Sequence, residues 1–323
     1  MTRPGMPWRL AAVAALAATC AAGLVESAGA ASGFPLRIHD ALRRTVVLPA
    51  PPRRIVSLAP SVTETLFALG LDAEIVGVSA ADDYPVAARG RSRVGGVELD
   101  YERIAALRPD LVVGVASLQR SSLQRLVGLG LPVLAVDVAG VDDVLGVIRV
   151  LGKVTGREGA AASLVAGLRR RIEEVTRITA RAATRPRVYV EIWPEPLMTA
   201  SVGTYLHDLI ERAGGRNVFG DLRGWPQVGA ETVIRRNPEV ILISGGGSVV
   251  GLRARRGWQA VAAVRAGRIH VVQGALIARP GPRLVDGLEA VARILHPTLF
   301  SQHYLPAVAT GALAGGATIQ AGR

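Results

Sequence analysis

Two glutamates hold equivalent places in a phrase that occurs twice in the chain. Glu102 opens residues 102–113 and Glu231 opens residues 231–242, so the two copies are 129 residues apart (102 to 231). In each copy the glutamate begins a short predicted helix that ends before a proline, and an acidic residue and an apolar strand follow. The period is too long for a solenoid and predicts two similar α/β lobes in tandem.

The two carboxylates could serve in three ways. Acid/base catalysis needs both groups close together across one substrate, and equivalent positions in two lobes argue against that convergence. At a helix start, each carboxylate could instead stabilise the helix dipole. The third role is docking, in which two equivalent acids meet two basic pockets of a symmetric partner. The residues alone leave helix stabilisation and docking open.

Aromatic and polar residues gather in the predicted loops at the carboxyl ends of strands, where open α/β sheets bind ligands. Three of the aromatic side chains stand beside prolines, and on such a stiffened loop each offers a flat surface to a large planar ligand. Packing beneath the loop is the alternative for each. The ligand-binding candidates are Pro60, Ser61, Asp83, Tyr84, Trp193, Trp225 and Arg279.

Signatures of catalysis and metal binding are weak. Residues 244–248 form a glycine-rich run, but it lacks the lysine of a phosphate-binding P-loop, so a tight turn is the better interpretation. His207 and Glu211 lie one turn apart and could supply two zinc or manganese ligands, yet no further cluster supports a metal site. No serine-nucleophile or paired-cysteine motif occurs. We expect no catalytic residue, metal or cofactor, and an exported hydrolase is the alternative class.

Strands alternate with helices along the chain, which predicts mostly parallel sheets covered on both faces. A first lobe over 53–155 follows an irregular, proline-rich leader, and its first helix starts with a predicted capping box at 61–64. A second lobe covers 185–300. The predicted strands are 54–58, 75–78, 111–115, 133–136, 187–190 and 269–272. The fold class is therefore α/β, with two Rossmann-like lobes and a ligand cleft between them.

Residues 156–184 predict one long amphipathic helix between the lobes. Apolar residues recur every three or four positions from Leu164 to Ile178, with Arg and Glu on the other face. At ~1.5 Å per residue this helix would reach ~40 Å. Because a helix resists bending, we expect a rigid strut that joins two lobes with separate cores and permits only modest closure.

Residues 1–31 have the character of an export signal. Arg3 and Arg9 supply positive charge beside an apolar run, and small residues at 28–30 suit cleavage, so we expect a periplasmic protein. Cys20, the only cysteine, lies in this segment. The residues before it match a lipidation signal poorly, which makes a lipid anchor the minority interpretation. Residues 305–323 lack periodicity and predict a loose tail.

The net charge of +12 is the difference between 38 basic and 26 acidic residues, and Lys153 is the only lysine. The arginines are scattered and are not interleaved with aromatic residues, so we expect no nucleic-acid partner. A basic face could still attract an anionic ligand or a membrane surface.

At residues 54–64, 76–79, 83–85 and 102–104 the chain resembles the substrate-binding proteins of ABC importers that have a rigid inter-lobe helix, and most of all their vitamin B12 (cobalamin)-binding branch. The resemblance covers roughly residues 53–297. It implies a monomeric receptor that delivers its ligand to a permease homodimer in the inner membrane. It further implies that Glu102 and Glu231 dock on arginines of that permease, that Trp225 packs against a corrinoid, and that Arg279 offers a polar contact.

The chain also departs from the cobalamin-binding branch. Ala81 stands where that branch has a tyrosine in the cleft, and Val115 stands where it has a tryptophan. Gly96 or Val97 falls near a second lost tryptophan. Trp193 would compensate from the opposite lobe.

These departures leave heme and a ferric siderophore as alternative ligands. Heme usually requires an axial tyrosine or histidine. The nearest candidates for that role are Tyr84 and Tyr205.

Overall fold

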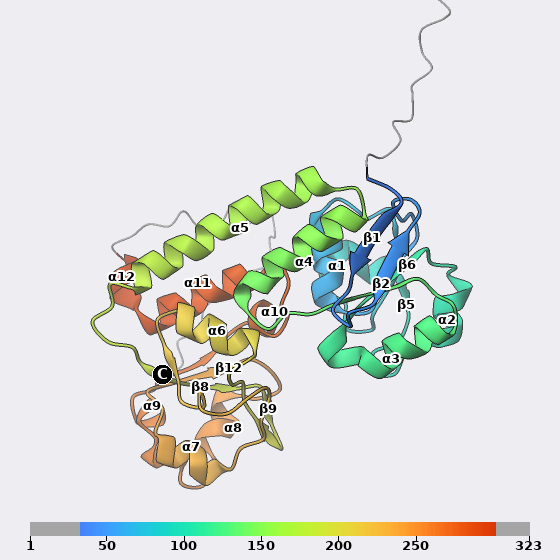
Figure 1. Ribbon diagram of the computed structural model, residues 1–323. Coiled ribbons are helices and arrows are strands. Elements are labelled where there is room, and N and C mark those ends of the chain that lie inside the picture. Colours follow the sequence, from blue (N-terminus) through green and yellow to red (C-terminus); the bar gives the residue numbers. More distant parts are fainter. Residues whose placement is uncertain (1–32, 302–323) are drawn as a thin grey trace, which may run out of the picture.

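A computed structural model describes residues 33–301 of the chain. The first lobe is built on five parallel strands in the order β5-β4-β3-β6-β7, with helices on both faces (Figure 1). Burial on both faces explains why these strands are short apolar runs without a polar side. The strands are β3 (Ile55–Ser57), β4 (Ile75–Val78), β5 (Ser92–Arg93), β6 (Leu111–Val115) and β7 (Val133–Val136). The helices are α1 (Pro60–Ala68), η1 (Val86–Gly90), α2 (Tyr101–Ala106), α3 (Ala116–Gly128) and α4 (Val141–Val154).

The second lobe repeats this plan with four parallel strands in the order β11-β8-β12-β13. Its strands are β8 (Arg187–Glu191), β11 (Arg216–Asn217), β12 (Val240–Ile243) and β13 (Ile269–Val271), beside a small hairpin of β9 (Trp193–Pro194) and β10 (Leu197–Met198). Its helices are α6 (Tyr205–Arg212), α7 (Ala230–Arg236), α8 (Val249–Arg253), η2 (Trp258–Ala260), α9 (Ala262–Arg265), α10 (Gly274–Ile277), α11 (Leu284–Leu295) and α12 (Pro297–Ser301).

Both sheets reverse their strand order at an equivalent point. In the first lobe the chain moves outward from β3 in one direction and then returns to β6 on the other side, and β8 and β12 stand in the same relation in the second lobe. Ligands of open α/β sheets bind outside the carboxyl ends of the strands at such a switch point. The topology therefore predicts that a ligand binds at the loops that follow these four strands.

The duplicated phrase folds in the same way in both lobes. It forms α2 and β6 in the first lobe and α7 and β12 in the second. After each helix, the residue directly before the proline has the left-handed conformation, Arg108 with φ of 44° and Asn237 with φ of 42°. The predicted tandem relation is thus visible in the backbone itself.

The acidic residue after each proline has a structural role. Asp110 accepts a hydrogen bond of 2.8 Å from the backbone N–H of Arg54, and Glu239 accepts one of 2.8 Å from that of Arg187. Each carboxylate thereby satisfies an N–H at the start of the neighbouring central strand, where no ladder partner exists.

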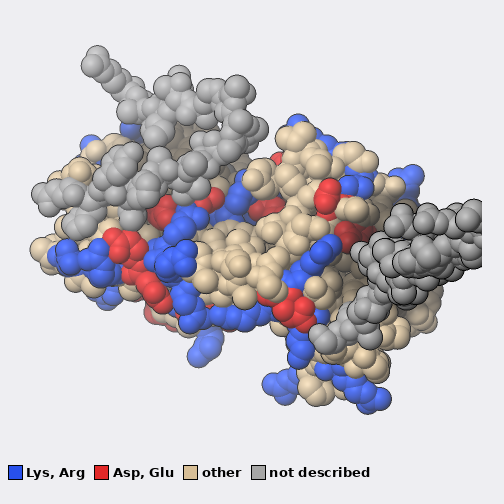
Figure 2. Space-filling model, turned by 90° about the horizontal axis from the view of Figure 1, so that it is seen from above, with Lys and Arg blue, Asp and Glu red and all other residues tan. Residues whose placement is uncertain are grey.

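The connecting helix α5 (Glu158–Thr179) lies along one side of both lobes (Figure 1). It falls inside the predicted range of 156–184 but is shorter, because Gly156, with φ of 67°, separates it from α4. With 22 residues it spans about 33 Å, less than the length expected from the sequence. Its exposed side is polar, and Figure 2 shows basic and acidic side chains close together on this face.

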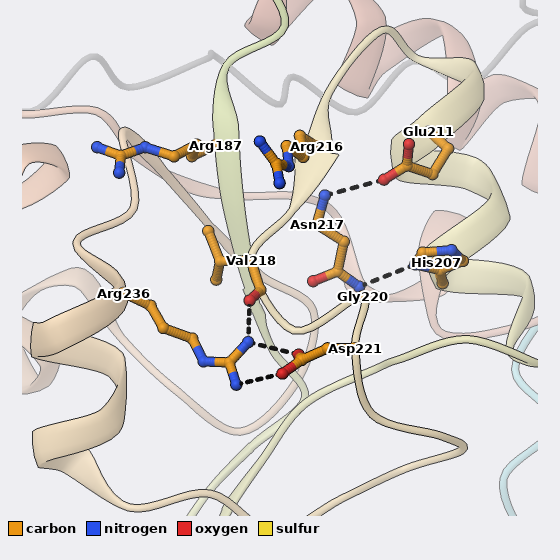
Figure 3. Close-up of a pocket in the computed structure, with 9 residues that line it drawn as sticks. All are labelled: Arg187, His207, Glu211, Arg216, Asn217, Val218, Gly220, Asp221 and Arg236. Carbon is orange, nitrogen blue, oxygen red and sulfur yellow. Dashed lines mark hydrogen bonds and ion pairs between the residues drawn. The ribbon is translucent and has the colours of Figure 1, made fainter.

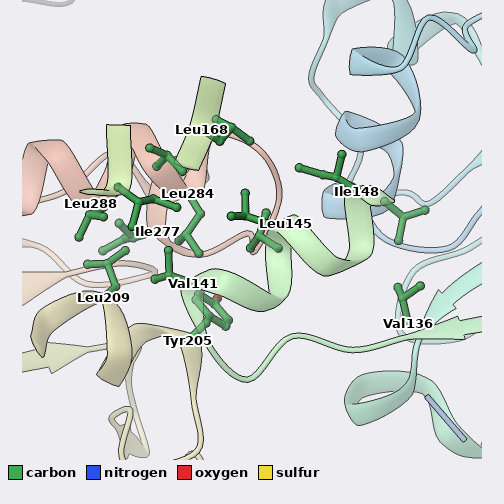
Figure 4. Close-up of a cluster of buried hydrophobic side chains, with 14 of the residues drawn as sticks. Val136, Val141, Leu145, Ile148, Leu168, Tyr205, Leu209, Ile277, Leu284 and Leu288 are labelled. Carbon is green, nitrogen blue, oxygen red and sulfur yellow. The ribbon is translucent and has the colours of Figure 1, made fainter. Parts of the chain in front are cut away.

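The expectation of two separate cores was wrong. One cluster of buried apolar side chains runs from the first lobe through α4 and α5 into α6 and α11 of the second lobe (Figure 4). Leu145 on α4, Leu168 on α5 and Leu284 on α11 all belong to it. Each sheet keeps a smaller cluster of its own on its other face. A large apolar junction of this kind opposes relative motion of the lobes.

Polar contacts reinforce the same junction. The guanidinium of Arg171 on α5 donates to Asp286 at 2.5 Å and to Glu289 at 2.8 Å, both on α11. At the start of α4, the backbone N–H of Val141 donates to the carboxylate of Asp208 on α6 at 2.7 Å. The strut is therefore tied to the second lobe along much of its length.

Two predictions about the beginning of the first lobe were also wrong. The leader is not irregular, since β1 (Leu36–His39) and β2 (Thr45–Leu48) form an antiparallel hairpin before the prolines. The predicted capping box does not form either. Pro60 occupies the first turn of α1, with Ala59 as its N-cap and no side-chain cap, because proline already has the φ of a helix start and needs no N–H partner.

The predicted export signal, Cys20 and the predicted tail at 305–323 lie outside the described residues. Within residues 33–301, none of the helices has both the length and the apolar character that a membrane span requires.

Candidate functional site

Glu102 and Glu231 lie in the first turns of α2 and α7, and both side chains are exposed. Figure 1 places these two helices at opposite ends of the molecule, α2 on the first lobe and α7 on the second. The two carboxylates therefore cannot act as an acid/base pair on one substrate, which needs them within about 10 Å of each other. The hydrolase hypothesis loses its candidate pair, while the interpretation as two separate docking points remains compatible with the geometry.

Three of the predicted ligand residues meet where the two lobes touch. Arg279, in the loop between α10 and α11, donates to the carboxylate of Asp83 at 2.5 Å and to the backbone oxygen of Ala81 at 3.0 Å. Tyr84 lies next to this pair and is 37% exposed. A loop of the second lobe thus reaches the loop that follows β4 in the first lobe.

Two further residues of this contact were missed in the sequence. Arg283 donates to both oxygens of the Glu64 carboxylate, at 2.9 and 2.6 Å, and its guanidinium lies 3.7 Å from the centre of the Tyr84 ring. Glu64 is only 4% exposed, on α1 of the other lobe. Such a bidentate arginine–carboxylate pair is a strong and directional contact. We refer to Glu64, Asp83, Tyr84, Arg279 and Arg283 as the inter-lobe cluster.

The sequence held a partial signal for these two residues. Glu64 was assigned to a capping box that does not form, which left its carboxylate without a role. Between residues 240 and 285 the chain has no aspartate or glutamate, so Arg279 and Arg283 must find acidic partners elsewhere. What the sequence could not show was that these partners lie on the other lobe.

The ion pairs of the cluster shift the pKa values of two of its side chains. The hydrogen bond from Arg279 holds the pKa of Asp83 below its ordinary value. Burial opposes the charge on Arg283, but its hydrogen bonds to Glu64 outweigh burial, so the pKa of that guanidinium is raised. The cluster combines two arginines with two carboxylates, so its formal charges cancel.

Asp82, next to the cluster, is a buried acid that the sequence did not single out. It is 1% exposed, and its Oδ2 accepts a hydrogen bond from the Ser79 hydroxyl at 2.5 Å. Its Oδ1 has no hydrogen-bond partner among the described residues. Burial raises the pKa of this carboxyl group, and the hydrogen bond from Ser79 only partly offsets that effect.

Pro60 and Ser61 lie beside this contact, after the carboxyl end of β3. Ser61 on α1 is 7% exposed, and the backbone of Gly281 approaches it so closely that a Cβ there would lie 3.2 Å from the Ser61 oxygen. A larger residue at this position would force the neighbouring Ser61 backbone to shift by a few tenths of an ångström. Pro60, directly before Ser61, is half-buried.

Trp193 and Trp225, both from the second lobe, present partly free faces. Trp193 is 51% exposed and Trp225 is 39% exposed. The ring of Trp225 packs edge-on against Tyr205, with centroids 5.5 Å apart. Tyr205 itself is buried, and burial raises the pKa of its hydroxyl, so the hydroxyl stays protonated. The buried ring gives Trp225 a fixed packing partner.

The glycine-rich run after β12 is a turn, as predicted. Gly246 has φ of 59°, and the hydroxyl of Ser248 accepts a hydrogen bond of 3.0 Å from the backbone N–H of Gly251 to cap α8. The run therefore starts a short helix and packs beneath Trp193, whose ring would lie 3.2 Å from a Cβ at Gly246.

His207 and Glu211 do not form a metal site. Glu211 accepts hydrogen bonds from the backbone N–H of Asn217 and from Arg185, and His207 Nδ1 lies 3.3 Å from the amide nitrogen of Asn217 (Figure 3). In the part of the chain that the structure describes, no group of three or more His, Cys, Asp or Glu side chains could hold a metal ion.

These two residues instead line a cavity of about 630 Å³ on the outer edge of the second lobe. A further cavity of about 470 Å³ lies between α5, α4 and α6. Neither cavity contains a predicted ligand residue or a member of the inter-lobe cluster.

Comparison with known proteins agrees with this geometry. The family described as periplasmic binding protein matches residues 55–275. An ABC transporter substrate-binding lipoprotein of Bacillus subtilis is 30% identical over 276 residues, which cover 83% of this chain and 88% of the relative. A vitamin B12-binding protein of Pectobacterium atrosepticum is 31% identical over 242 residues, covering 72% and 85% of the two chains.

Among solved structures, the chain is similar to a periplasmic heme-binding protein from Roseiflexus. The TM-score is 0.70 with 25% identity, and the match covers 76% of this chain and 99% of the other.

Proposed function

The chain belongs to the periplasmic binding protein family, and we propose that it is a solute receptor that binds a corrinoid between its lobes and delivers it to an ABC permease. The relatives at 30% and 31% identity are named as an ABC transporter substrate-binding lipoprotein and as a vitamin B12-binding protein, not as enzymes. This general role agrees with two equivalent sheets and with exposed aromatic side chains in the loops that follow their strands.

The observation that carries the proposal is the convergence of loops from both lobes on the inter-lobe cluster. Trp193 and Trp225 on one lobe and Tyr84 on the other keep between about a third and a half of their surface free. Flat rings on loops at the carboxyl ends of strands suit a large ring-shaped guest. The cancelling charges of the cluster favour a guest without strong net charge, and a corrinoid has a broad and largely neutral face.

Heme is a second candidate, because one specific side chain favours it. Tyr84 is accessible, lies at the contact between lobes, and could serve as an axial oxygen ligand. Tyr205, the other residue considered for this role, is buried against Trp225 with a raised pKa and is poorly suited. A heme receptor should therefore depend on Tyr84, whereas a corrinoid receptor should depend on Trp225.

Titration of the mature protein with cyanocobalamin, hemin and a ferric hydroxamate would separate the candidates. We expect cyanocobalamin to quench tryptophan fluorescence at micromolar concentration and Trp225→Ala to weaken binding about tenfold or more, the loss expected for a buried aromatic contact. Tyr84→Phe serves as the matched control, since it keeps the ring and removes only the hydroxyl. Absence of quenching by cyanocobalamin would exclude the corrinoid, and a Soret shift that disappears in Tyr84→Phe would establish heme.

Glu102 and Glu231 are proposed as the docking points for the permease, one for each lobe. Exposed ion pairs contribute only ~0 to 1 kcal/mol each, so these acids would set orientation and encounter rate more than affinity. The double variant Glu102→Ala with Glu231→Ala should bind ligand as the unmodified protein does and fail in import. Glu158→Ala with Glu173→Ala, two exposed acids on α5, removes the same charge elsewhere and should import normally. Weaker ligand binding in the first double variant would contradict docking.

We also propose that residues 1–31 export the protein to the periplasm. One relative is named a lipoprotein, which keeps lipidation of Cys20 as the alternative. Metabolic labelling with a fatty acid should leave the protein unlabelled, and label that disappears in Cys20→Ala would establish the anchored form.

A further inference from the structure

The cavity on the outer edge of the second lobe is lined mainly by polar and charged side chains. It lies along β11, the edge strand of the sheet, between α6 and α7, and holds about 630 Å³ (Figure 3). Three arginines line it, together with one histidine and two acids: Arg187, His207, Glu211, Arg216, Asp221 and Arg236. The cavity is separate from the inter-lobe cluster and shares no residue with it.

Two of these charged side chains have a structural task that explains their presence. Glu211 accepts a hydrogen bond of 3.0 Å from the backbone N–H of Asn217, and Arg236 donates to the backbone oxygen of Val218. Both groups thus satisfy the free edge of β11, which would otherwise expose unpaired backbone groups. Arg236 is further neutralised by Asp221, with hydrogen bonds to both carboxylate oxygens.

Arg187 and Arg216 have no comparable task. They are direct partners in the register of β8 and β11, so their side chains leave the sheet on the same face. Figure 3 shows both guanidinium groups at the same end of the cavity. Arg187 forms one long ion pair with Glu239, at 3.9 Å, and the guanidinium of Arg216 has no acid within 4.0 Å in the described part of the chain.

Like charges on paired residues of adjacent strands destabilise a sheet. The long ion pair of Arg187 offsets this repulsion only in part, and the edge strand is only two residues long, so an anion between the two cations would relieve it. Two arginines that share one face give several N–H donors, which is the arrangement that binds phosphate oxygens well.

We propose that this cavity binds a phosphate group, held by Arg187 and Arg216 at one end of the cavity. His207, on α6, lines the same cavity, and its Nδ1 already faces the side-chain amide of Asn217. The site is independent of the inter-lobe cluster, so it would bind with or without the transported ligand. The phosphate could be inorganic phosphate or the headgroup of an anionic phospholipid.

Calorimetric titration of the mature protein with inorganic phosphate tests the site, at constant ionic strength maintained with chloride. We expect saturable binding with a dissociation constant in the millimolar range or below. Arg216→Gln should weaken it about tenfold, as expected for the loss of one charge-assisted contact, and Arg187→Gln with Arg216→Gln should abolish it. Arg120→Gln, an exposed arginine of the first lobe, is the matched control and should leave binding unchanged.

Flotation with vesicles of phosphatidylglycerol, against vesicles of phosphatidylcholine, distinguishes the sources. Vesicle binding that is lost in the double variant, with no response to inorganic phosphate, would assign the site to a lipid headgroup. Binding of phosphate and vesicles that persists unchanged in the double variant would overturn the proposal. The proposal would also fail if the unmodified protein bound neither phosphate nor vesicles. Cyanocobalamin binding by the double variant is measured in parallel and should be unchanged, so failure of this site is distinguishable from failure of the receptor function.

Discussion

The two lobes share a backbone plan but divide the chemistry unequally. Both reverse strand order at the same point, and both carry an exposed glutamate in the first turn of an equivalent helix. The inter-lobe cluster, in contrast, takes its acids Glu64 and Asp83 from the first lobe and its cations Arg279 and Arg283 from the second. What is duplicated therefore suits a partner with two equivalent halves, and what differs suits a single guest held between unlike surfaces.

The shared core shows that the two lobes are less independent than their separate sheets suggest. Each lobe has its own sheet and its own small cluster, yet the largest cluster belongs to both. In a receptor with separable lobes, a ligand could close them like a hinge. Here the common core, the ties from α5 to α11 and the inter-lobe cluster all oppose such a movement, so recognition must rely on surfaces that are already in place.

The largest effect is expected from a change in the shared core. Leu145→Ala removes a side chain that is 1% exposed on α4, and loss of a buried leucine costs about 2–5 kcal/mol of unfolding free energy. Because this residue serves both lobes, hydrogen exchange should accelerate in β6 and in β12 together. Acceleration confined to one lobe would show that the lobes are stable separately and would contradict the single-core interpretation.

The next largest effect should come from the buried half of the inter-lobe cluster. Glu64→Ala leaves Arg283 largely desolvated without its carboxylate partner, which should lower the unfolding free energy by about 3 kcal/mol. Asp83→Ala is the matched control, because the Asp83 side chain is 57% exposed and its ion pair should contribute under about 1 kcal/mol. Urea unfolding of both variants measures the difference. Equal losses would show that burial does not distinguish the two acids.

The sequence was sufficient to predict much of the fold. Apolar runs bounded by turn residues predicted β4, β6 and β7 with their observed limits. These elements are specified locally, by periodicity and by their termini. The hairpin of β1 and β2 was missed because its short strands stand in a region that the prolines seemed to mark as irregular.

The site was harder to predict, since its key contacts join residues more than 190 positions apart. Asp83 and Arg279 were each singled out for a ligand, but their contact with each other depends on how the second lobe is set against the first. Glu64 was read locally as a helix cap, a role that Pro60 had already made unnecessary. Local patterns gave the residue types, and only tertiary packing gave the partners.

The smallest effect concerns the buried acid beside the cluster. The folded state raises the pKa of Asp82 above 3.8, so this group contributes stability below its unfolded pKa and that contribution is lost as pH rises through the folded pKa. Asp82→Asn resembles the protonated form at every pH. The variant should therefore gain stability relative to the unmodified protein as pH rises from about 4 toward neutrality. Urea unfolding across this range measures the difference, which should stay flat if Asp82 is solvated in the folded protein. Because Asp83 carries a lowered pKa one residue further along the chain, Asp83→Asn should show the opposite trend, with the change near and below a pH of about 4. This contrast separates burial from ion pairing at neighbouring positions.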